Sequence, residues 1–256
     1  MFDLTGRTAV ITGSSRGIGR AIAEAMVAAG ARVVISSRKQ EACDATAAEI
    51  NAIHGADRAV AIAASISSKP ALEALVAETG DRLGPIDILV CNAATNPYYG
   101  PMSGIADDQF RKVFENNVLA NHWLIGMVAP QMIERRAGAI VVVSSIGGLI
   151  GSDKIGAYNI SKAADFQLVR NLAVEFGPHN VRVNAIAPGT VRTDFARALW
   201  EDPVAEAAVA RVTPLGRIGE PREIAGAAVF LASEAGGFIT GQSIVIDGGM
   251  TIHSGL

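Results

Sequence analysis

The chain has 256 residues, half of them are hydrophobic, and its formal net charge is −3. This length fits one or two domains, and α/β folds of this size are often single domains. The slightly acidic balance, with no basic run, argues against nucleic acid as the main partner. Two cysteines without CxxC spacing and four scattered histidines predict neither a disulfide framework nor a metal site, and favour a reducing, cytoplasmic compartment.

Short runs rich in Val, Ile and Ala alternate with longer helical patterns. The predicted strands are residues 8–12, 32–36, 59–64, 86–91, 139–145, 181–187 and 243–247, and the predicted helices are 18–29, 39–53, 69–82, 107–135, 157–176 and 221–232. The strands are nearly continuous apolar runs, which is typical of parallel strands covered on both faces. The alternation predicts a single-domain α/β fold over residues 1–256, a Rossmann-like doubly wound parallel sheet with helices on both faces.

No segment predicts export or membrane insertion. The N-terminus has an acid at Asp3 and no basic stretch before an apolar core, so it does not resemble a signal peptide. The uncharged stretch 116–133 contains too many polar residues for a membrane span. The sequence therefore predicts a cytoplasmic protein with no membrane partner.

The turn between the first strand and the first helix reads TGSSRGIG, residues 12–19. Glycine permits a tight turn and lets a phosphate approach the backbone, while the helix N-terminus offers free N–H groups. The GxxxGxG spacing differs from the GxGxxG fingerprint and from a P-loop. A glycine-rich turn can be a plain connection, but directly after the first strand it predicts a dinucleotide site formed by Gly13, Ser14, Ser15, Arg16, Gly17, Ile18 and Gly19.

The end of the second strand bears on the choice of dinucleotide. An acid at this place usually binds the adenosine ribose in NAD sites, but here Ser37 occupies it and Arg38 follows. No carboxylate repels a 2′-phosphate, and Arg38, together with Arg16, can pair with one. NADP(H) is therefore favoured and NAD(H) stays possible; the alternative is that Arg38 is only a solvated residue at the start of the next helix.

The segment YNISK, residues 158–162, places a phenol four residues before an ammonium. Positions i and i+4 share one face of a helix, and a nearby lysine lowers the pKa of a tyrosine. To act near neutral pH, the pKa of Tyr158 must fall by about 3 units from about 10, which is roughly 4 kcal/mol. Lys162 alone is not expected to lower the pKa of Tyr158 this far, so a second positive charge is needed near the phenol.

Seven segments occur in an order that resembles a known family: TGSSRGIG, CNAA, NNV, SSIGG, YNISK, APGTVRTD and ITGQSIVIDGG. Together they give the chain, over essentially its whole length, a resemblance to single-domain short-chain dehydrogenases/reductases, especially NADP-dependent carbonyl reductases and 3-oxoacyl reductases. The resemblance implies reversible hydride transfer between NADP(H) and a ketone or secondary alcohol. It also implies a homotetramer that pairs the helices 107–135 and 157–176.

The resemblance assigns roles to the catalytic residues. Tyr158 is the acid/base, and Lys162 binds the nicotinamide ribose and lowers the tyrosine pKa, with the oxidised nicotinamide as the second positive charge. The serine thirteen residues before Tyr158 is Ser145, which positions the substrate carbonyl. Ser144 is the runner-up, expected to point elsewhere.

The family asparagine of the long central helix holds a water that links the lysine to solvent. It precedes a Val or Leu directly, which selects Asn117. Asn116 is expected to be a packing or capping neighbour.

Further cofactor contacts are implied at the later strand ends. Asn92 stabilises the sheet beside the cofactor, Pro188 and Gly189 shape the nicotinamide wall, and Val191 and Thr193 contact the carboxamide.

Two departures from the family pattern stand out. Ala94 replaces a glycine, and Ser65 replaces an aspartate that contacts adenine, where the Ser65 hydroxyl and the Ile66 backbone are expected to substitute.

The segment near 190–215 resembles a substrate lid. It contains Phe195, Leu199 and Trp200, which favours an apolar ketone, quinone or acyl-chain substrate; the alternative is packing in an oligomer interface. Two other functions remain open: an NAD-dependent alcohol dehydrogenase of the same fold, and a non-catalytic dinucleotide-binding regulatory protein.

Overall fold

Seven parallel strands form one sheet in the order β3-β2-β1-β4-β5-β6-β7. The computed structural model describes residues 1–252. Its strands are β1 (Thr8–Thr12), β2 (Arg32–Ser36), β3 (Ala59–Ala61), β4 (Ile88–Cys91), β5 (Gly138–Val143), β6 (Val181–Pro188) and β7 (Ser243–Ile246). Its α-helices are α1 (Gly17–Ala28), α2 (Gln40–His54), α3 (Lys69–Leu83), α4 (Asp107–Phe114), α5 (Ala120–Arg135), α6 (Gly156–Phe176), α7 (Pro203–Val212) and α8 (Pro221–Ala232). The predicted doubly wound fold is confirmed.

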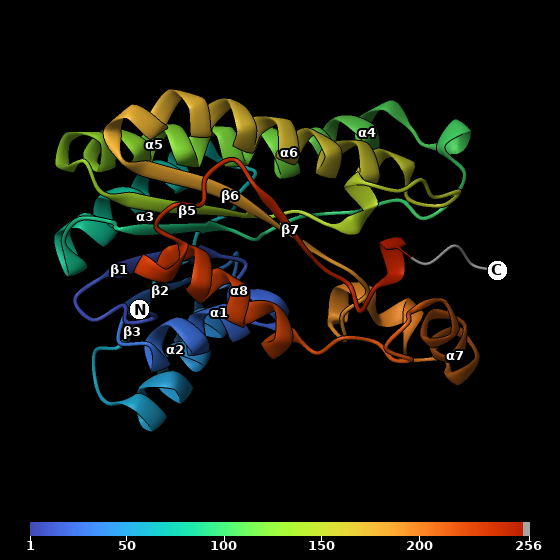
Figure 1. The fold of residues 1–256 in the computed structure, drawn as a ribbon, viewed down its shortest axis with the longest axis horizontal. Helices are drawn as coiled ribbons and strands as arrows, with labels where there is room; N and C mark the ends of the chain where they lie inside the picture. The colour runs from blue at the N-terminus through green and yellow to red at the C-terminus, as the bar shows by residue number, and fades with distance from the viewer. Residues whose placement is uncertain (253–256) are drawn as a thin grey trace.

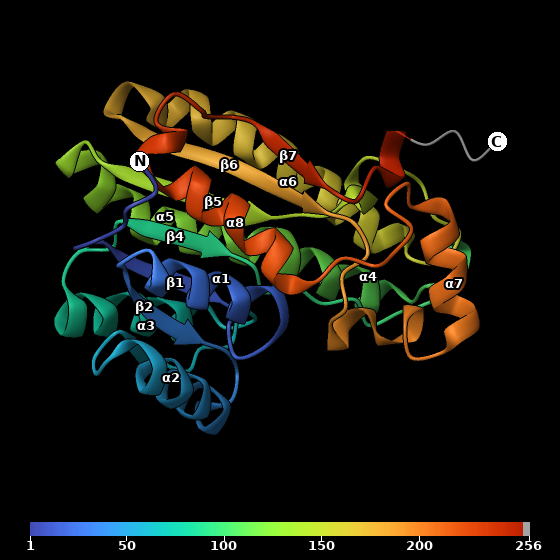
Figure 2. The ribbon, with the colours of Figure 1, turned by 60° about the horizontal axis from the view of Figure 1, so that its bottom comes forward.

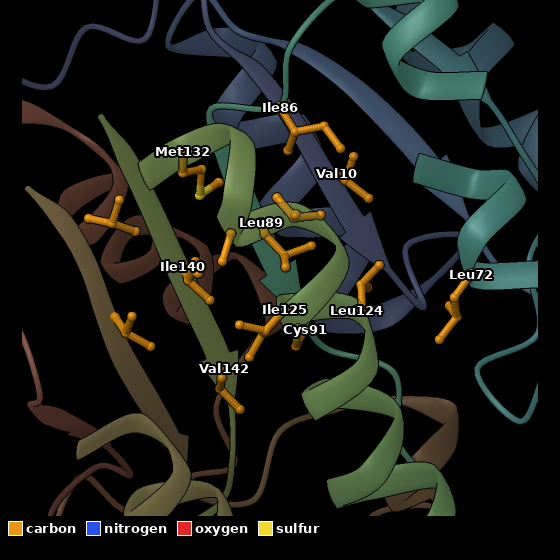
Figure 3. Packing of buried hydrophobic residues seen from close by; sticks show 14 of the residues in the cluster. Val10, Leu72, Ile86, Leu89, Cys91, Leu124, Ile125, Met132, Ile140 and Val142 are labelled. Carbon is orange, nitrogen blue, oxygen red and sulfur yellow. The ribbon is translucent and has the colours of Figure 1, made fainter. Parts of the chain in front are cut away.

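The helices cover both faces of the sheet (Figure 1). Side chains alternate between the faces along each strand: Val10 packs with α3, α5 and α6, whereas its neighbours Ala9 and Ile11 pack with α1, α2 and α8. Figure 3 shows the first of these layers, in which Leu124 and Ile125 of α5 lie over the sheet beside Cys91. Because β1, β2, β4, β5 and β6 are covered on both faces, they appear in the sequence as continuous apolar runs.

The strand order reverses between β1 and β4. From β1 the next strands, β2 and β3, are added on one side of the sheet, and β4 is then added on the other side of β1. Ile11 of β1 pairs in register with Val90 of β4. The segments that leave the carboxyl ends of these two strands therefore diverge to opposite faces and leave a crevice, the usual binding position in such sheets.

The long predicted helix 107–135 is interrupted. A π-helical turn, Glu115–Leu119, joins α4 to α5, and the Ala120 N–H donates to the carbonyl of Glu115 instead of that of Asn116. Such turns often occur at functional sites. The third, fourth and fifth strands are also shorter than the apolar runs that predicted them, although some hydrogen bonds to neighbouring strands continue beyond their ends, as from the Ile62 N–H to the Ile35 carbonyl and from the Ser144 N–H to the Ile186 carbonyl.

The segment after β6 is more regular than its sequence indicated. It contains a 3₁₀ turn, Asp194–Leu199, and then α7, which lies beyond the carboxyl ends of β6 and β7 (Figure 2). The Asp202 side chain accepts a hydrogen bond from the Val204 N–H at 3.0 Å and Pro203 begins the helix, a common N-terminal pattern. None of the described helices has the length and apolar character that crossing a bilayer requires.

Candidate active site

The glycine turn after β1 is built for close backbone approach. A Cβ atom on Gly19 would lie 2.5 Å from the Gly13 carbonyl oxygen and 2.5 Å from the Asn92 side-chain nitrogen, so only glycine fits. Gly17 has a φ of +58°, and a Cβ atom on it would contact the Thr193 side chain. Helix α1 starts after Arg16 without a side-chain cap, so its first N–H groups stay available to an anion. These features fit a dinucleotide pyrophosphate.

The two serines of the turn already make hydrogen bonds within the protein. Ser14 is fully buried; its hydroxyl donates to the Ile11 carbonyl at 2.7 Å and accepts from the Ser36 N–H at 2.9 Å. The Ser15 carbonyl accepts a hydrogen bond from Thr46 of α2. The Ile18 side chain packs into the core under α1. A ligand would therefore meet mainly the backbone of this turn.

Asn92 ties the turn to β4. Its side-chain nitrogen donates to the carbonyls of Thr12 at 2.9 Å and Gly13 at 3.2 Å. The Thr12 hydroxyl in turn accepts from the N–H groups of Asn92 and Ala93. Ala94 has a negative φ, so the alanine in place of the family glycine causes no backbone strain.

The two arginines expected at a 2′-phosphate have different surroundings. Arg38 is exposed after β2, and within residues 1–252 its side chain makes no ion pair. Arg16 forms an ion pair with Asp194 at 3.0 Å. The Ser37 hydroxyl lies 3.2 Å from the Cys43 sulfur. Because Arg38 makes no ion pair in this part of the chain, it is free to bind a phosphate. Arg16, in contrast, is held by Asp194 in the segment after β6.

The predicted adenine end of the site is partly polar. The Ser65 hydroxyl lies 2.8 Å from that of Ser67. Ile66 packs its side chain against the core and leaves its backbone for contacts.

Tyr158 and Lys162 lie one turn apart on α6. Lys162 is buried, and its ammonium donates to the Val143 carbonyl at 2.9 Å and to Asp165 at 3.1 Å. The ammonium lies 5.7 Å from the centre of the Tyr158 ring. Burial acts against its charge, but the carboxylate of Asp165, with the Tyr158 phenol, outweighs burial and raises the pKa of Lys162. The lysine therefore stays charged in an apolar interior.

The two candidate serines at the end of β5 point to different surroundings. Ser144 is buried, and its hydroxyl donates to the Lys162 carbonyl at 2.8 Å. Ser145 is partly exposed, and its hydroxyl accepts from the Gly147 N–H at 3.0 Å. Only the Ser145 hydroxyl is thus placed where a substrate can reach it.

The side chains of the two asparagines in the π-helical turn hold the loop after β4. Asn117 accepts from the Thr95 N–H at 2.8 Å and donates to the Thr95 carbonyl and to the Ser161 hydroxyl, both at 3.0 Å. Asn116 donates to the Thr95 hydroxyl. The carbonyl of Asn117 accepts from the Asn121 side chain at 2.7 Å.

Two residues of this cluster were not anticipated from sequence. Asp165 is fully buried beside Lys162, and Asn121 donates to it at 3.1 Å. A signal was present: Asp165 interrupts the apolar face of α6 three residues after Lys162, a spacing that brings side chains together on a helix.

The residues after β6 complete the surroundings. Gly189 follows Pro188, and a Cβ atom on it would lie 2.8 Å from Asp247, so this wall is tightly packed. Val191 is buried and forms a β-bridge with Gly219. The Thr193 hydroxyl accepts from the Ala196 N–H and donates to the Val191 carbonyl.

An aromatic contact and a cavity also belong to this region. The Phe195 ring lies 5.7 Å from the Tyr158 ring, centre to centre. A cavity of about 720 Å³ is lined by Gly17, Thr193, Arg192, Asp194 and Trp200, among others. It adjoins the glycine turn, but Tyr158 and Lys162 do not line it.

The chain as a whole is similar to known proteins. A family model described as enoyl-(acyl carrier protein) reductase matches residues 13–251. The chain is 39% identical over 251 residues to dehydrogenase/reductase SDR family member 4 of Bos taurus, covering 98% of this chain and 89% of that protein.

Solved structures agree with the fold. A gluconate 5-dehydrogenase from Burkholderia cenocepacia, in complex with NADP and tartrate, has a TM-score of 0.93 at 32% identity, covering 98% of this chain and 97% of that one. A 7α-hydroxysteroid dehydrogenase, complexed with NADH and 7-oxo glycochenodeoxycholic acid, has a TM-score of 0.92 at 36% identity, covering 97% and 95%. The chain therefore belongs to the short-chain dehydrogenase/reductase family of oxidoreductases.

Proposed function

We propose that the protein transfers a hydride between NADP(H) and the carbon of a ketone or secondary alcohol in an apolar substrate, with Tyr158 as the acid/base. The observation that carries this proposal is the Tyr158–Lys162 pair, one helical turn apart beside the carboxyl end of β5. The nicotinamide supplies the hydride in reduction and accepts it in oxidation.

The chain's own residues handle the oxygen and the proton. In reduction, the carbonyl oxygen takes the phenolic proton of Tyr158 as the carbon gains the hydride. The Ser145 hydroxyl donates a hydrogen bond to that oxygen while negative charge develops on it. Lys162 stabilises the resulting tyrosinate, and a proton returns from solvent through Lys162, Asn117 and water. Oxidation reverses each step.

NADP(H) is proposed over NAD(H) because of the charge at the end of β2. Ser37 offers no carboxylate to repel a 2′-phosphate, and the exposed Arg38 offers a guanidinium to pair with it. The relatives include both situations, since one solved structure holds NADP and another NADH. The preference therefore rests on this chain's own residues.

Substrate access and assembly complete the proposal. We assign residues 190–215 to a substrate lid of a single catalytic domain, since Phe195 packs on Tyr158. The contact supports an apolar substrate. A homotetramer is proposed because large apolar side chains lie exposed near the edge strand β7 and on α6, with Phe238 and Val174 the clearest cases. Sedimentation velocity tests this assembly; a monomer at working concentration contradicts it.

The function is tested by NADPH oxidation at neutral pH against ketones, diketones, quinones and 3-oxoacyl thioesters. Tyr158→Phe should lower turnover by about 10²–10⁴-fold, while the Kd for NADPH stays within a few-fold. Tyr99→Phe, at an exposed tyrosine, is the matched control and should keep wild-type turnover. Comparable turnover in the two variants would rule out the acid/base role. Tight NADPH binding without turnover of any compound favours the non-catalytic binding protein.

A further inference from the structure

We propose that Asp165 is a positioning residue: its buried ion pair holds the Lys162 ammonium beside Tyr158, and its negative charge sets the pH range in which this pair works. The inference rests on the proposed function for its kinetic consequence. Its structural basis is independent of substrate and cofactor.

The ion pair lies completely inside the protein. The exposed fractions of the Lys162 and Asp165 side chains are 2% and 0%. A buried charge whose partner is removed is strongly unfavourable, because neither water nor an opposite charge compensates it. Within residues 1–252, one carboxylate lies within ion-pair distance of the Lys162 ammonium, and it belongs to Asp165. It therefore provides the compensation that lets a charged lysine reside under the active site.

Both oxygens of Asp165 are used, which fixes its orientation. One accepts from the Lys162 ammonium at 3.1 Å, and the other accepts from the Asn121 amide at 3.1 Å. The same amide nitrogen donates at 2.7 Å to the Asn117 carbonyl, in the π-helical turn. A continuous buried chain of polar groups thus runs from that carbonyl through Asn121 and Asp165 to Lys162. This row of polar groups fixes the ammonium from the side of α5 and the π-helical turn.

The charges around the ammonium determine the sign of the effect. On α6 the ionisable groups are Tyr158 and Asp165, and from β4 comes the Cys91 thiol, whose pKa is raised mainly by burial and next by Asp165. Facing groups on β5, α5 and the π-helical turn are uncharged: the Val143 carbonyl, Asn121 and Asn117. Asp165 is thus the negative charge that keeps Lys162 charged. Removing it lowers the pKa of Lys162 and so withdraws the positive charge that stabilises tyrosinate.

The first experiment is an ultraviolet titration of tyrosinate in the cofactor-free protein. The chain has three tyrosines, and the spectrum of Tyr158→Phe isolates the contribution of Tyr158. Asp165→Asn should make Tyr158 ionise at a pH higher by about 1 unit, because Lys162 loses the charge that stabilises tyrosinate. The matched control is Glu175→Gln, which removes an exposed acid from the same helix and should leave the titration unchanged.

The kinetic counterpart is the pH profile of carbonyl reduction. Reduction needs the protonated phenol, so the alkaline limb of kcat/KM should move to higher pH in Asp165→Asn, while Asp165→Glu, which keeps the charge, should stay near wild type. Should Asp165→Asn fail to fold, Asp165→Ser is the second neutral variant, with room for water and the same upward shift expected.

A folded neutral variant whose tyrosine titration matches wild type would overturn the inference and leave the ion pair as a link between α5 and α6. The titration needs no turnover. A failure of the proposed function, seen as turnover retained in Tyr158→Phe, is therefore distinguishable from a failure of this inference.

Discussion

Arg16, in the turn after β1, forms an ion pair of 3.0 Å with Asp194, which lies 178 residues further along the chain. Arg197 binds the other oxygen of the same carboxylate at 2.8 Å. The hydrogen bond from Arg197, together with the charges of both arginines, holds the pKa of Asp194 below its ordinary value. The carboxylate therefore stays ionised at neutral pH and occupies the Arg16 guanidinium.

Asp194→Asn should release Arg16 and increase NADPH affinity. Because the ion pair is exposed, the expected decrease in the Kd for NADPH is about two- to five-fold, with the Kd for NADH unchanged. Fluorescence titration of both cofactors measures this. Glu201→Gln, an exposed acid in the same segment, is the control. A weaker binding of NADPH in Asp194→Asn would show that the ion pair organises the cofactor site instead of competing for it.

Arg38→Ala should weaken NADPH binding by about 10- to 100-fold, because a charge-assisted contact to the 2′-phosphate is lost. NADH lacks this phosphate, so its affinity should stay the same. Isothermal titration of both cofactors gives the ratio, and Arg58→Ala tests whether any exposed arginine near β3 has this effect. Equal losses for NADPH and NADH would contradict the assignment to the phosphate.

Phe195→Ala should raise the KM for apolar carbonyl compounds about three- to ten-fold, because the ring packed on Tyr158 is lost from the substrate side. The kcat at saturation should change less, since the acid/base group itself is intact. Phe238→Ala removes a fully exposed ring elsewhere and should leave both constants at wild-type values. An unchanged KM in Phe195→Ala would place the substrate away from this ring.

Gly19→Ala should destabilise the protein by about 1–3 kcal/mol, because the added Cβ would lie 2.5 Å from the Gly13 carbonyl. Gly126→Ala is the matched control on α5, where a Cβ meets nothing within 4 Å. It should stabilise the protein by about 0.5–1 kcal/mol through backbone entropy. Urea unfolding measures both. Equal stability of the two variants would mean that the glycine turn relaxes around a methyl group.

Most elements were predictable because their signals are local. The continuous apolar strands and the glycine turn gave the parallel sheet and the order of its strands along the chain. The helix α7 was missed although Asp202 and Pro203 mark its start, because the family resemblance assigned its whole segment to a substrate lid. The π-helical turn at Glu115–Leu119 has no sequence pattern that separates it from an α-helix.

In the candidate site, too, local relationships were predictable from the sequence and long-range ones were not. Tyr158 and Lys162 are neighbours on one helix, so their relationship follows from the 3.6-residue period and from a resemblance to a known family. The pairing of Arg16 with Asp194 joins residues 178 positions apart, and no local pattern contains it.

The sequence by itself determined the fold class, the family and the order of the candidate catalytic residues, because hydrophobic periodicity and short motifs act over a few residues. The tertiary structure decided which charges meet. The pairing of Arg16 with Asp194 and the burial of Asp165 beside Lys162 depend on how β1, β5, α6 and the segment after β6 converge. Electrostatic interactions depend on distance in space and on exclusion of water, and only packing sets these two quantities.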